Sequence, residues 1–575
     1  MTWPRILQYA LFLLVVTLLV KPVGGYLTRV FTGERTLLDP LLRPVERAIY
    51  RVCGVDPTQE MDWKRYAAAF VRFGAFGTIA LYAILRLQQH LPWYVTVNPS
   101  TPMTVDLATN TSVSFATSTT WQAYAGEITM SYFSQMAGLT AQNFLAGAAG
   151  LAVGIAFIRG FARQGVDALG NFWVDLVRST LWVLLPASIV GALLLVWRGV
   201  PANLNHYAAV TTLAGGTQLI PQGPVAALEF IKNLGTNGGG FFNANGAHPF
   251  ENPTPFTNFF EMLAIAVVPA ALTNTFGRMV RRPCQGWLLY WVMAILFSIA
   301  LLLGGWAEQH GNPRLTAAGA DQSAEIAGRV APGGNMEGKE TRFGVGGSIL
   351  TAVVTSDGAT GSYNSMHDSY TPLGGMVPLV NMLLGEMIFG GLGTGLYSIL
   401  MVALLGLFLS GLMVGRTPEY LGKRLGPHET RLITLYALVS PFAILIPTAL
   451  ALVTARGLAG LTTNSGAHGL TEIFYAYTSS FTNNGQNFAG LSANTPFYNY
   501  STAIAMLLGR VGLAVAALAL AGNLARQSRR AISPGSFPTD SPLFGSVVIG
   551  TALIVVGLGF FPVLALGPII EHFSL

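Results

Sequence analysis

Long apolar runs recur from one end of the chain to the other, with short polar stretches between them. Clear examples are residues 7–20, 182–197 and 287–306. Runs of about twenty apolar residues match the hydrocarbon thickness of a bilayer when they are helical. We count about ten such runs, the first near residues 6–26 and the last near residues 544–566. The pattern predicts an all-α, polytopic membrane protein with about ten transmembrane helices.

Four weaker segments lie between these runs, and each is apolar for about ten residues before it breaks into Thr, Ser, Asn and Gly. Such a segment is too short and too polar to cross a bilayer, but it suits a re-entrant half-helix followed by an extended turn. The breaks recur about every 120 residues. We take them at Ser118, Gly238, Gly361 and Gly485. This spacing predicts four fused repeats of helix, re-entrant loop and helix around a pseudo-fourfold pore.

The repeats divide the chain into six parts. Residues 1–65 hold the first helix and a cytoplasmic segment, and residues 531–575 hold the last helix. The four repeats are assigned to residues 66–165, 166–284, 285–428 and 429–530.

Charge is scarce, at 10% of residues, and its placement predicts the topology. Lys and Arg gather after every second run, for example at Arg163, Arg282 and Arg529, whereas residues 90–126 contain neither. The positive-inside rule then places both termini and the entrances of all four re-entrant loops outside. The positive charge follows the first apolar run, which predicts a retained helix and not a cleaved signal peptide. The same rule explains the net charge of +6 without a nucleic-acid partner.

Four half-helices that enter from outside would direct their partly negative C-terminal ends at one axis. The residues that follow offer backbone carbonyls, hydroxyls and amides, and glycine lets the chain turn its carbonyls inward. Carbonyl rings of this kind replace the hydration shell of K⁺ in potassium filters. We therefore predict a filter for a monovalent cation, with aromatic residues such as Phe241 packed behind it.

Two ionisable residues fall deep inside predicted helices, where charge is costly and usually faces a cavity or a partner. Arg510 lies in the last repeat and Glu386 in the third, beside a run of glycines that includes Gly391 and Gly393. These glycines should break their helix below the filter. We predict a gate formed by this broken segment and Arg510, with a structural Arg510–Glu386 ion pair as the alternative.

Catalytic chemistry finds little support in the sequence. The stretch GGNMEGK lacks the Ser or Thr of a nucleotide-binding loop and lies in a predicted outer loop. No DKTGT-like motif is present, so the chain is not expected to hydrolyse ATP. The spacing of the outer residues His248, Glu251, His367, Asp368 and His468 matches no metal-ligand template, which favours structural hydrogen bonding.

Several long motifs resemble one family. They are TNGGGFFNANGAHPFENPT, NSMHDSYTPLGGMV, GNMEGKETRFG and GRTPEYLGKRL. The chain is similar, over nearly its whole length, to the potassium-binding subunit of Kdp-type potassium-transporting ATPases, within a superfamily of four-repeat potassium transporters. The resemblance implies that the filter residues are Ser118, Thr119, Thr236, Asn237, Gly238, Ala359, Thr360, Gly361, Asn483, Asn484 and Gly485. It also assigns Gln122 a role in potassium affinity. The first loop departs from the family pattern, because asparagine is expected at Ser118 and Thr120 and cysteine is an alternative at Thr360.

The resemblance further implies a subunit without catalytic activity in a potassium uptake complex of the bacterial inner membrane. The expected partners are a P-type ATPase catalytic subunit, a single-span subunit, a small peptide subunit and membrane lipid, with K⁺ as the transported ligand and no cofactor. A stand-alone, gradient-driven potassium channel or symporter is the alternative. A polytopic membrane enzyme would require acidic residues clustered at one membrane face, which the sequence lacks.

Overall fold

The computed structural model of the chain describes residues 3–93, 103–326, 329–415, 418–530 and 537–575. Within these ranges ten helices are long and apolar enough to cross a membrane, as the sequence predicts. The first is α1 (Trp3–Thr32) and the last is α21 (Pro542–Leu564), which continues through η8 (Ala565–Ile569) into α22 (Ile570–Phe573). Residues 531–536 of the predicted last segment lie outside the described residues.

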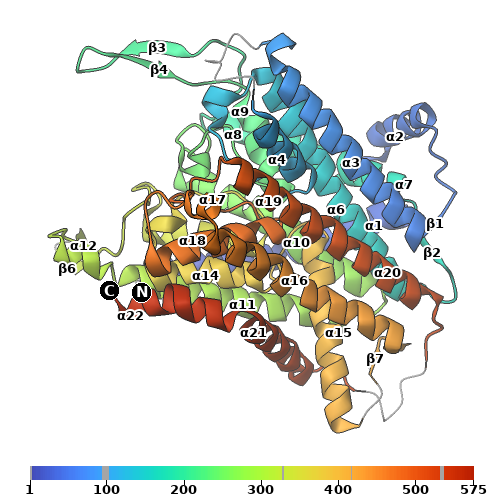
Figure 1. Cartoon of the computed structure of the whole chain (residues 1–575). Helices are drawn as coiled ribbons and strands as arrows, with labels where there is room; N and C mark the ends of the chain where they lie inside the picture. Colours follow the sequence, from blue (N-terminus) through green and yellow to red (C-terminus); the bar gives the residue numbers. More distant parts are fainter. Residues whose placement is uncertain (1–2, 94–102, 327–328, 416–417, 531–536) are drawn as a thin grey trace.

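The other spanning helices form four successive units, each with a short re-entrant helix between two long elements (Figure 1). The first unit contains α3 (Trp63–Leu87), re-entrant α4 (Val105–Ala116), and η3 (Ser134–Thr140) running into α6 (Ala141–Ala162). The second contains α7 (Phe172–Arg178), η4 (Ser179–Leu184) and α8 (Leu185–Trp197), then re-entrant α9 (Val225–Leu234) and α10 (Pro255–Met279). The third contains α11 (Pro283–Gln309), re-entrant α13 (Gly344–Asp357), α14 (Pro372–Leu383) and α15 (Thr394–Val414). The fourth contains α16 (Pro427–Val453), re-entrant α18 (Gly466–Phe481), and α19 (Pro496–Leu507), η7 (Leu508–Gly512) and α20 (Leu513–Arg526). Four helix–loop–helix repeats are thereby confirmed.

In the first, second and fourth units the second long helix is continuous; it begins at a threonine cap, passes through a π-helical turn, or does both. In the third unit the corresponding helix is broken. Residues 384–393 separate α14 from α15 and are not helical. Gly385, Glu386, Phe389 and Gly393 have positive φ angles in this break. The break that the glycine run predicts is therefore present. Its apolar residues are buried, which shows that it lies inside the bundle.

The two ends of the molecule differ in their loops (Figure 1). At one end lie both termini, the short helix α12 (Pro313–Ala317), and the hairpins β3–β4 (Ala208–Thr211, Thr217–Ile220) and β5–β6 (Ser323–Ile326, Arg329–Pro332). At the other end lie amphipathic α2 (Asp39–Cys53), β1–β2 (Met61–Asp62, Ala168–Gly170) and β7–β8 (Glu419–Tyr420, Lys423–Arg424). These ribbons are the strands of an otherwise helical fold.

Candidate ion-binding site

All four re-entrant helices end with the same backbone turn. In each, an amide N–H beyond the helix donates to the carbonyl five residues earlier, which is the longer bond of a Schellman motif. These bonds are Thr119 to Ser114 (2.9 Å), Asn237 to Lys232 (2.9 Å), Thr360 to Thr355 (3.0 Å) and Asn484 to Ser479 (2.9 Å). The repeats are therefore equivalent at the level of single hydrogen bonds.

The residue before each of these donors is left-handed, although none of the four is glycine. The φ angles are 67° at Ser118, 49° at Thr236, 51° at Ala359 and 57° at Asn483. A side chain in this region costs about 1–2 kcal/mol, and such strain gathers where a structure over-determines the backbone for function. Four strained residues at equivalent positions mark the ends of the re-entrant helices as the candidate site.

Beyond these turns the four loops touch one another in cyclic order. The amide of Gly361 donates to the carbonyl of Asn237 (3.1 Å). A Cβ on Gly361 would lie 3.1 Å from Cα of Gly485, and one on Gly485 would overlap the carbonyl oxygen of Thr119. Thr120 Oγ1 donates to the Asn237 carbonyl (2.6 Å), which completes the cycle. We call these four interlocked loops the ring. All eleven residues predicted for the filter are buried at this ring, and the structure brings all of them together.

The alignment of the first loop with the other three needs a correction. The four helix ends share the hydrogen bond and the left-handed residue described above. Thr120 lies two residues beyond the left-handed position and therefore corresponds to Gly238, Gly361 and Gly485. Ser118 corresponds instead to Thr236, Ala359 and Asn483. The sequence-based spacing placed Ser118 with the glycines, because a loop without glycine offers no marker for its register. Thr120 has a φ of 52°, close to a conformation that glycine adopts easily.

Two residues predicted to support the filter connect neighbouring loops. Gln122 accepts from the amide of Gly240 (2.8 Å) and donates to its carbonyl (3.1 Å), which joins the exits of the first and second loops. Phe241 is fully buried, with its ring 5.1 Å from that of Phe242 and 6.2 Å from that of Tyr132. Both residues therefore hold the second loop against residues of the first unit.

A buried ionic cluster behind the second loop was not predicted. The Lys232 ammonium lies 2.5 Å from Glu229 Oε2 and 2.6 Å from Glu251 Oε2, and it donates to Asn245 Oδ1 (2.7 Å). Asn245 in turn donates to the carbonyl of Gly239 (2.7 Å). A lysine within an apolar re-entrant segment was the available signal, because a buried charge requires partners. Its charge is balanced by carboxylates, so the loops still present no unpaired cation from this source.

The ring lies between an open vestibule and a small cavity. The vestibule has a volume of about 670 Å³, and each of the four loop exits contributes to its lining, with Gln122, Asn243, Tyr363 and Asn487 among the lining residues. The cavity on the other side has a volume of about 10 Å³, room for about one water-sized sphere. All four left-handed residues line it. An ion that entered from the vestibule would pass the ring before it reached this cavity.

The predicted gating residues lie at the small cavity. Arg510, Glu386 and Gly391 line it, whereas Gly393 packs against α6 outside it. The guanidinium of Arg510 donates to the carbonyl of Ala146 (2.8 Å). No ion pair within 4.0 Å joins the described residues Arg510 and Glu386, so the direct pair considered as an alternative is not formed. Both side chains line the same cavity without direct contact between them.

The broken segment is coupled directly to the filter. The amide of Leu392 donates to Thr236 Oγ1 (2.9 Å), and Thr236 is the left-handed residue of the second loop. On the other side, Gly154 of α6 approaches Gly393 so closely that a Cβ would lie about 3.4 Å from two of its backbone atoms and nearer still to a third. A movement of residues 384–393 would therefore disturb the filter and α6 together.

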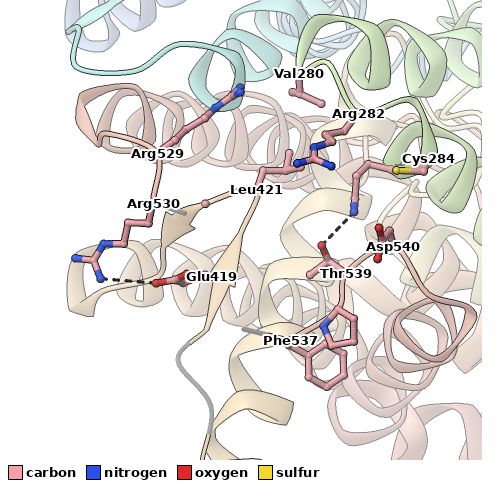
Figure 2. Close-up of a pocket in the computed structure, with 13 residues that line it drawn as sticks. Val280, Arg282, Cys284, Glu419, Leu421, Arg529, Arg530, Phe537, Thr539 and Asp540 are labelled. Atoms are coloured by element: carbon pink, nitrogen blue, oxygen red, sulfur yellow. Dashed lines mark hydrogen bonds and ion pairs between the residues drawn. The ribbon is translucent and has the colours of Figure 1, made fainter. Parts of the chain in front are cut away.

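The basic residues predicted on the cytoplasmic side line a different cavity, at the end of the molecule with β7 (Figure 2). It has a volume of about 290 Å³, and Arg282, Arg529 and Arg530 are among its lining residues. Arg530 lies 3.6 Å from Glu419, while Gln285 donates to Thr539 (3.1 Å). This cavity does not contact the filter, and its positive lining agrees with the predicted charge asymmetry.

The histidines and carboxylates near the loop exits have mostly structural roles. Glu251 accepts from the amide of Phe242 (2.8 Å) and pairs with Lys232, as described above. Burial and the nearby Lys339 ammonium lower the pKa of His367 to about 3, so its ring is neutral. Its Nδ1 lies 3.1 Å from the hydroxyl of Tyr475. Lys339, within the phosphate-loop-like stretch, forms a buried ion pair with Glu308 (2.7 Å).

Comparison with known proteins identifies the family of the chain. The family described as "Potassium-transporting ATPase A subunit" matches residues 10–573. The chain belongs to this family. A relative from Methylobacterium nodulans named potassium-transporting ATPase potassium-binding subunit is 53% identical over 569 residues, which is 99% of this chain and 97% of that protein. A relative of the same name from Solibacter usitatus is 50% identical, over 100% of this chain and 98% of its own length.

The fold of this family member also resembles a solved structure. The potassium transporter TrkH from Vibrio parahaemolyticus aligns with a TM-score of 0.50 and 14% identity, over 88% of this chain and 97% of that one. At this identity the likeness concerns the fold alone. The two chains share the arrangement of helices.

Proposed function

We propose that this chain is the potassium-binding subunit of an ATP-driven potassium uptake complex and that the four-loop ring is its selectivity filter. One observation carries the proposal: four re-entrant helices end at one axis with the same strained turn, and their loops interlock. The family and the names of the relatives support it.

In this proposal K⁺ enters the vestibule from the outer face. Oxygen atoms of the ring then replace the water molecules of its hydration shell. The C-terminal ends of the four half-helices favour a cation, and carbonyl and hydroxyl oxygens replace its hydration shell. The ring excludes anions by its partial charges. Interlocked loops hold the oxygens at a fixed spacing, which is the physical basis of a preference for K⁺ over Na⁺.

The cavity below the ring is the proposed gate. Arg510 opposes a cation there, while Glu386 attracts one, and residues 384–393 carry Glu386. A shift of this segment would change the balance of charge that the ion meets, and the Leu392–Thr236 hydrogen bond would transmit the shift to the filter. If Arg510 has this role, Arg510→Gln will change the potassium-stimulated ATPase activity of the complex. Unchanged activity would exclude it.

The ion is then passed to a partner. We propose that a P-type ATPase catalytic subunit hydrolyses ATP and that a single-span subunit and a small peptide subunit complete the complex. The proposed setting is a bacterial inner membrane with both termini outside. The termini lie at the end of the molecule that carries α12 and β6 (Figure 1), and residues 338–340, shortly after β6, line the vestibule.

The test is purification of the chain from its native membrane in mild detergent, with identification of bound proteins. ATP hydrolysis is then measured against K⁺ and Na⁺. A co-purifying P-type ATPase that responds to K⁺ and not to Na⁺ supports the proposal. A chain that comes alone, and carries K⁺ in vesicles down its gradient without ATP, would establish the channel or symporter instead.

A further inference from the structure

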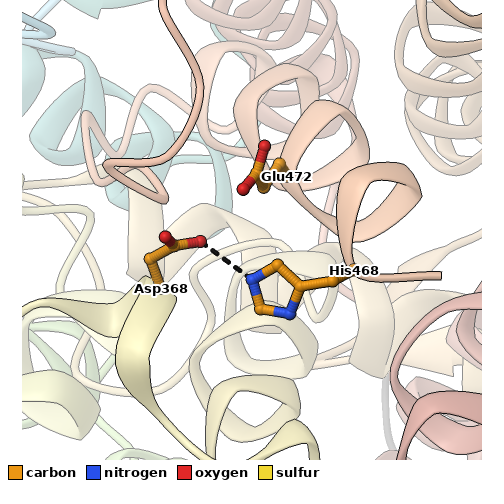
Figure 3. A group of neighbouring side chains, drawn as sticks. All are labelled: Asp368, His468 and Glu472. Carbon is orange, nitrogen blue, oxygen red and sulfur yellow. Dashed lines mark hydrogen bonds and ion pairs between the residues drawn. The ribbon is translucent and has the colours of Figure 1, made fainter. Parts of the chain in front are cut away.

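A compact cluster of metal-binding side chain types lies at the vestibule end, away from the filter. Asp368 belongs to η6 (His367–Ser369), the exit of the third loop, whereas His468 and Glu472 lie one turn apart on α18. Figure 3 shows the three side chains directed toward one another. One ligand atom from each lies within 4.8 Å of the other two. Ligands bonded to one ion at about 2.0–2.2 Å lie at most about 4.4 Å apart, so a small closure would suffice.

Glu472 is the feature that a structural hydrogen-bond network does not explain. The residue is fully buried, and its Oε2 has no hydrogen-bond partner within the described part of the chain. Its Oε1 accepts from Asn464 (2.7 Å). A buried carboxylate oxygen without a donor is costly, and a cation is the partner that such an oxygen prefers.

Space for an ion is preserved by a glycine. A Cβ at Gly490 would overlap Glu472 Oε1 and would lie 2.8 Å from Asp368 Oδ2. Any other residue at this position would therefore fill the space between the two carboxylates. The side chains of His468 and Asp368 keep 17% and 11% of their surface exposed, which gives an ion a route from solvent.

A third carboxylate orients the histidine. His468 Nδ1 lies 2.8 Å from Glu571 Oε1 on the C-terminal α22, while Nε2 lies 2.9 Å from Asp368 Oδ1. A carboxylate that accepts from one ring nitrogen directs the lone pair of the other toward a metal, and histidine ligands almost always donate their second N–H to a carboxylate, a backbone carbonyl or water. Glu571 therefore fixes the tautomer in which Nε2 faces Asp368 and Glu472.

We propose that Asp368, His468 and Glu472 bind one divalent transition-metal ion of the zinc or manganese class, with Glu571 as the orienting carboxylate. One imidazole nitrogen and two carboxylates suit such ions better than K⁺ or Ca²⁺, which prefer oxygen alone. The spacing along the chain concealed this site, because its residues come from three distant segments. This proposal gives Asp368 and His468 a role beyond the structural hydrogen bonding that the sequence predicts.

The site would join three parts of the vestibule end and lies close to the fourth loop. The ring of Phe488 stacks on His468 (5.7 Å) and on Tyr475 (4.3 Å). Tyr475 donates to Gln486 (2.8 Å), which adjoins Gly485 of the ring. A bound metal would hold the third loop exit, α18 and the last helix together, and would stiffen the support of the fourth loop.

The test uses the full chain in its purified complex, stripped with a chelator and titrated with ZnCl₂ or MnCl₂ by calorimetry. We expect one saturable site per chain and a higher unfolding temperature with metal. His468→Gln and Glu472→Gln should weaken binding at least tenfold, and Glu571→Gln should weaken it less. His206→Gln, in an exposed outer loop, is the matched control and should bind as the wild type does.

Cobalt provides a readout that does not depend on the variants folding. Co²⁺ bound to the wild type should give visible absorption bands that Zn²⁺ abolishes by competition. The proposal is overturned if the wild type shows no saturable binding below millimolar metal, or if His468→Gln binds as tightly as the wild type. Size-exclusion chromatography and the unfolding temperature without metal, measured in parallel, report whether each variant is folded.

Discussion

Replacing Gly238 with alanine tests whether contact between loops sets potassium affinity. Gly238 has a φ of 99°, and a Cβ there would lie 2.6 Å from the carbonyl carbon of Gly361 and nearer still to its Cα and amide nitrogen. Ordinary carbon contacts are about 3.5–4.0 Å, so the second and third loops must separate by about 1 Å. The left-handed backbone adds about 1–2 kcal/mol of strain.

The neighbouring glycine supplies the control. Gly239 has a φ of 73°, but a Cβ there would meet Phe115, Gln122 and Thr120 no closer than 3.3 Å, and all three contacts are with side chains. Gly239→Ala thus carries similar backbone strain without the overlap. The difference between the two variants isolates the contact between loops.

We expect Gly238→Ala to weaken potassium affinity at least tenfold more than Gly239→Ala, which corresponds to about 1.4 kcal/mol. The measurement is the K⁺ concentration that gives half-maximal ATPase stimulation, with K⁺ binding by calorimetry beside it. Equal affinities for the two alanine variants would refute the reasoning, because backbone strain alone would then account for both.

Three further substitutions test the surroundings of the ring. Lys232→Met should cost about 3–5 kcal/mol, because it leaves two buried carboxylates unpaired, and an unchanged unfolding temperature would contradict this. Thr236→Val removes the acceptor for the Leu392 amide and should lower the free energy of unfolding by about 1–3 kcal/mol. It should also alter potassium-stimulated ATPase activity. Unaltered activity would show that the broken segment and the filter are uncoupled. Lys423 donates to three backbone carbonyls at 2.6–2.8 Å at the opposite end. Lys423→Met should therefore lower the unfolding temperature and leave potassium affinity unchanged, and a changed affinity would argue against a purely structural role.

The sequence by itself determined the spans, the four repeats and the location of the loops. The hydrocarbon core of the bilayer requires each spanning helix to be apolar over its own length. A local pattern therefore suffices to predict a span. The broken helix beside Gly391 is also a local matter, because adjacent glycines weaken a helix wherever they occur. Family motifs then led to the filter residues, although their roles remain proposals.

Only the tertiary structure decided which residues meet. The register of Thr120 depends on how the helix before it ends, and the burial of Lys232 depends on Glu251, which lies nineteen residues later. Packing between repeats separates Arg510 from Glu386. It also brings Asp368 within hydrogen-bonding distance of His468. Side-chain contacts between distant segments leave no period in the sequence, because each partner is selected by its neighbours in space and not by its neighbours along the chain.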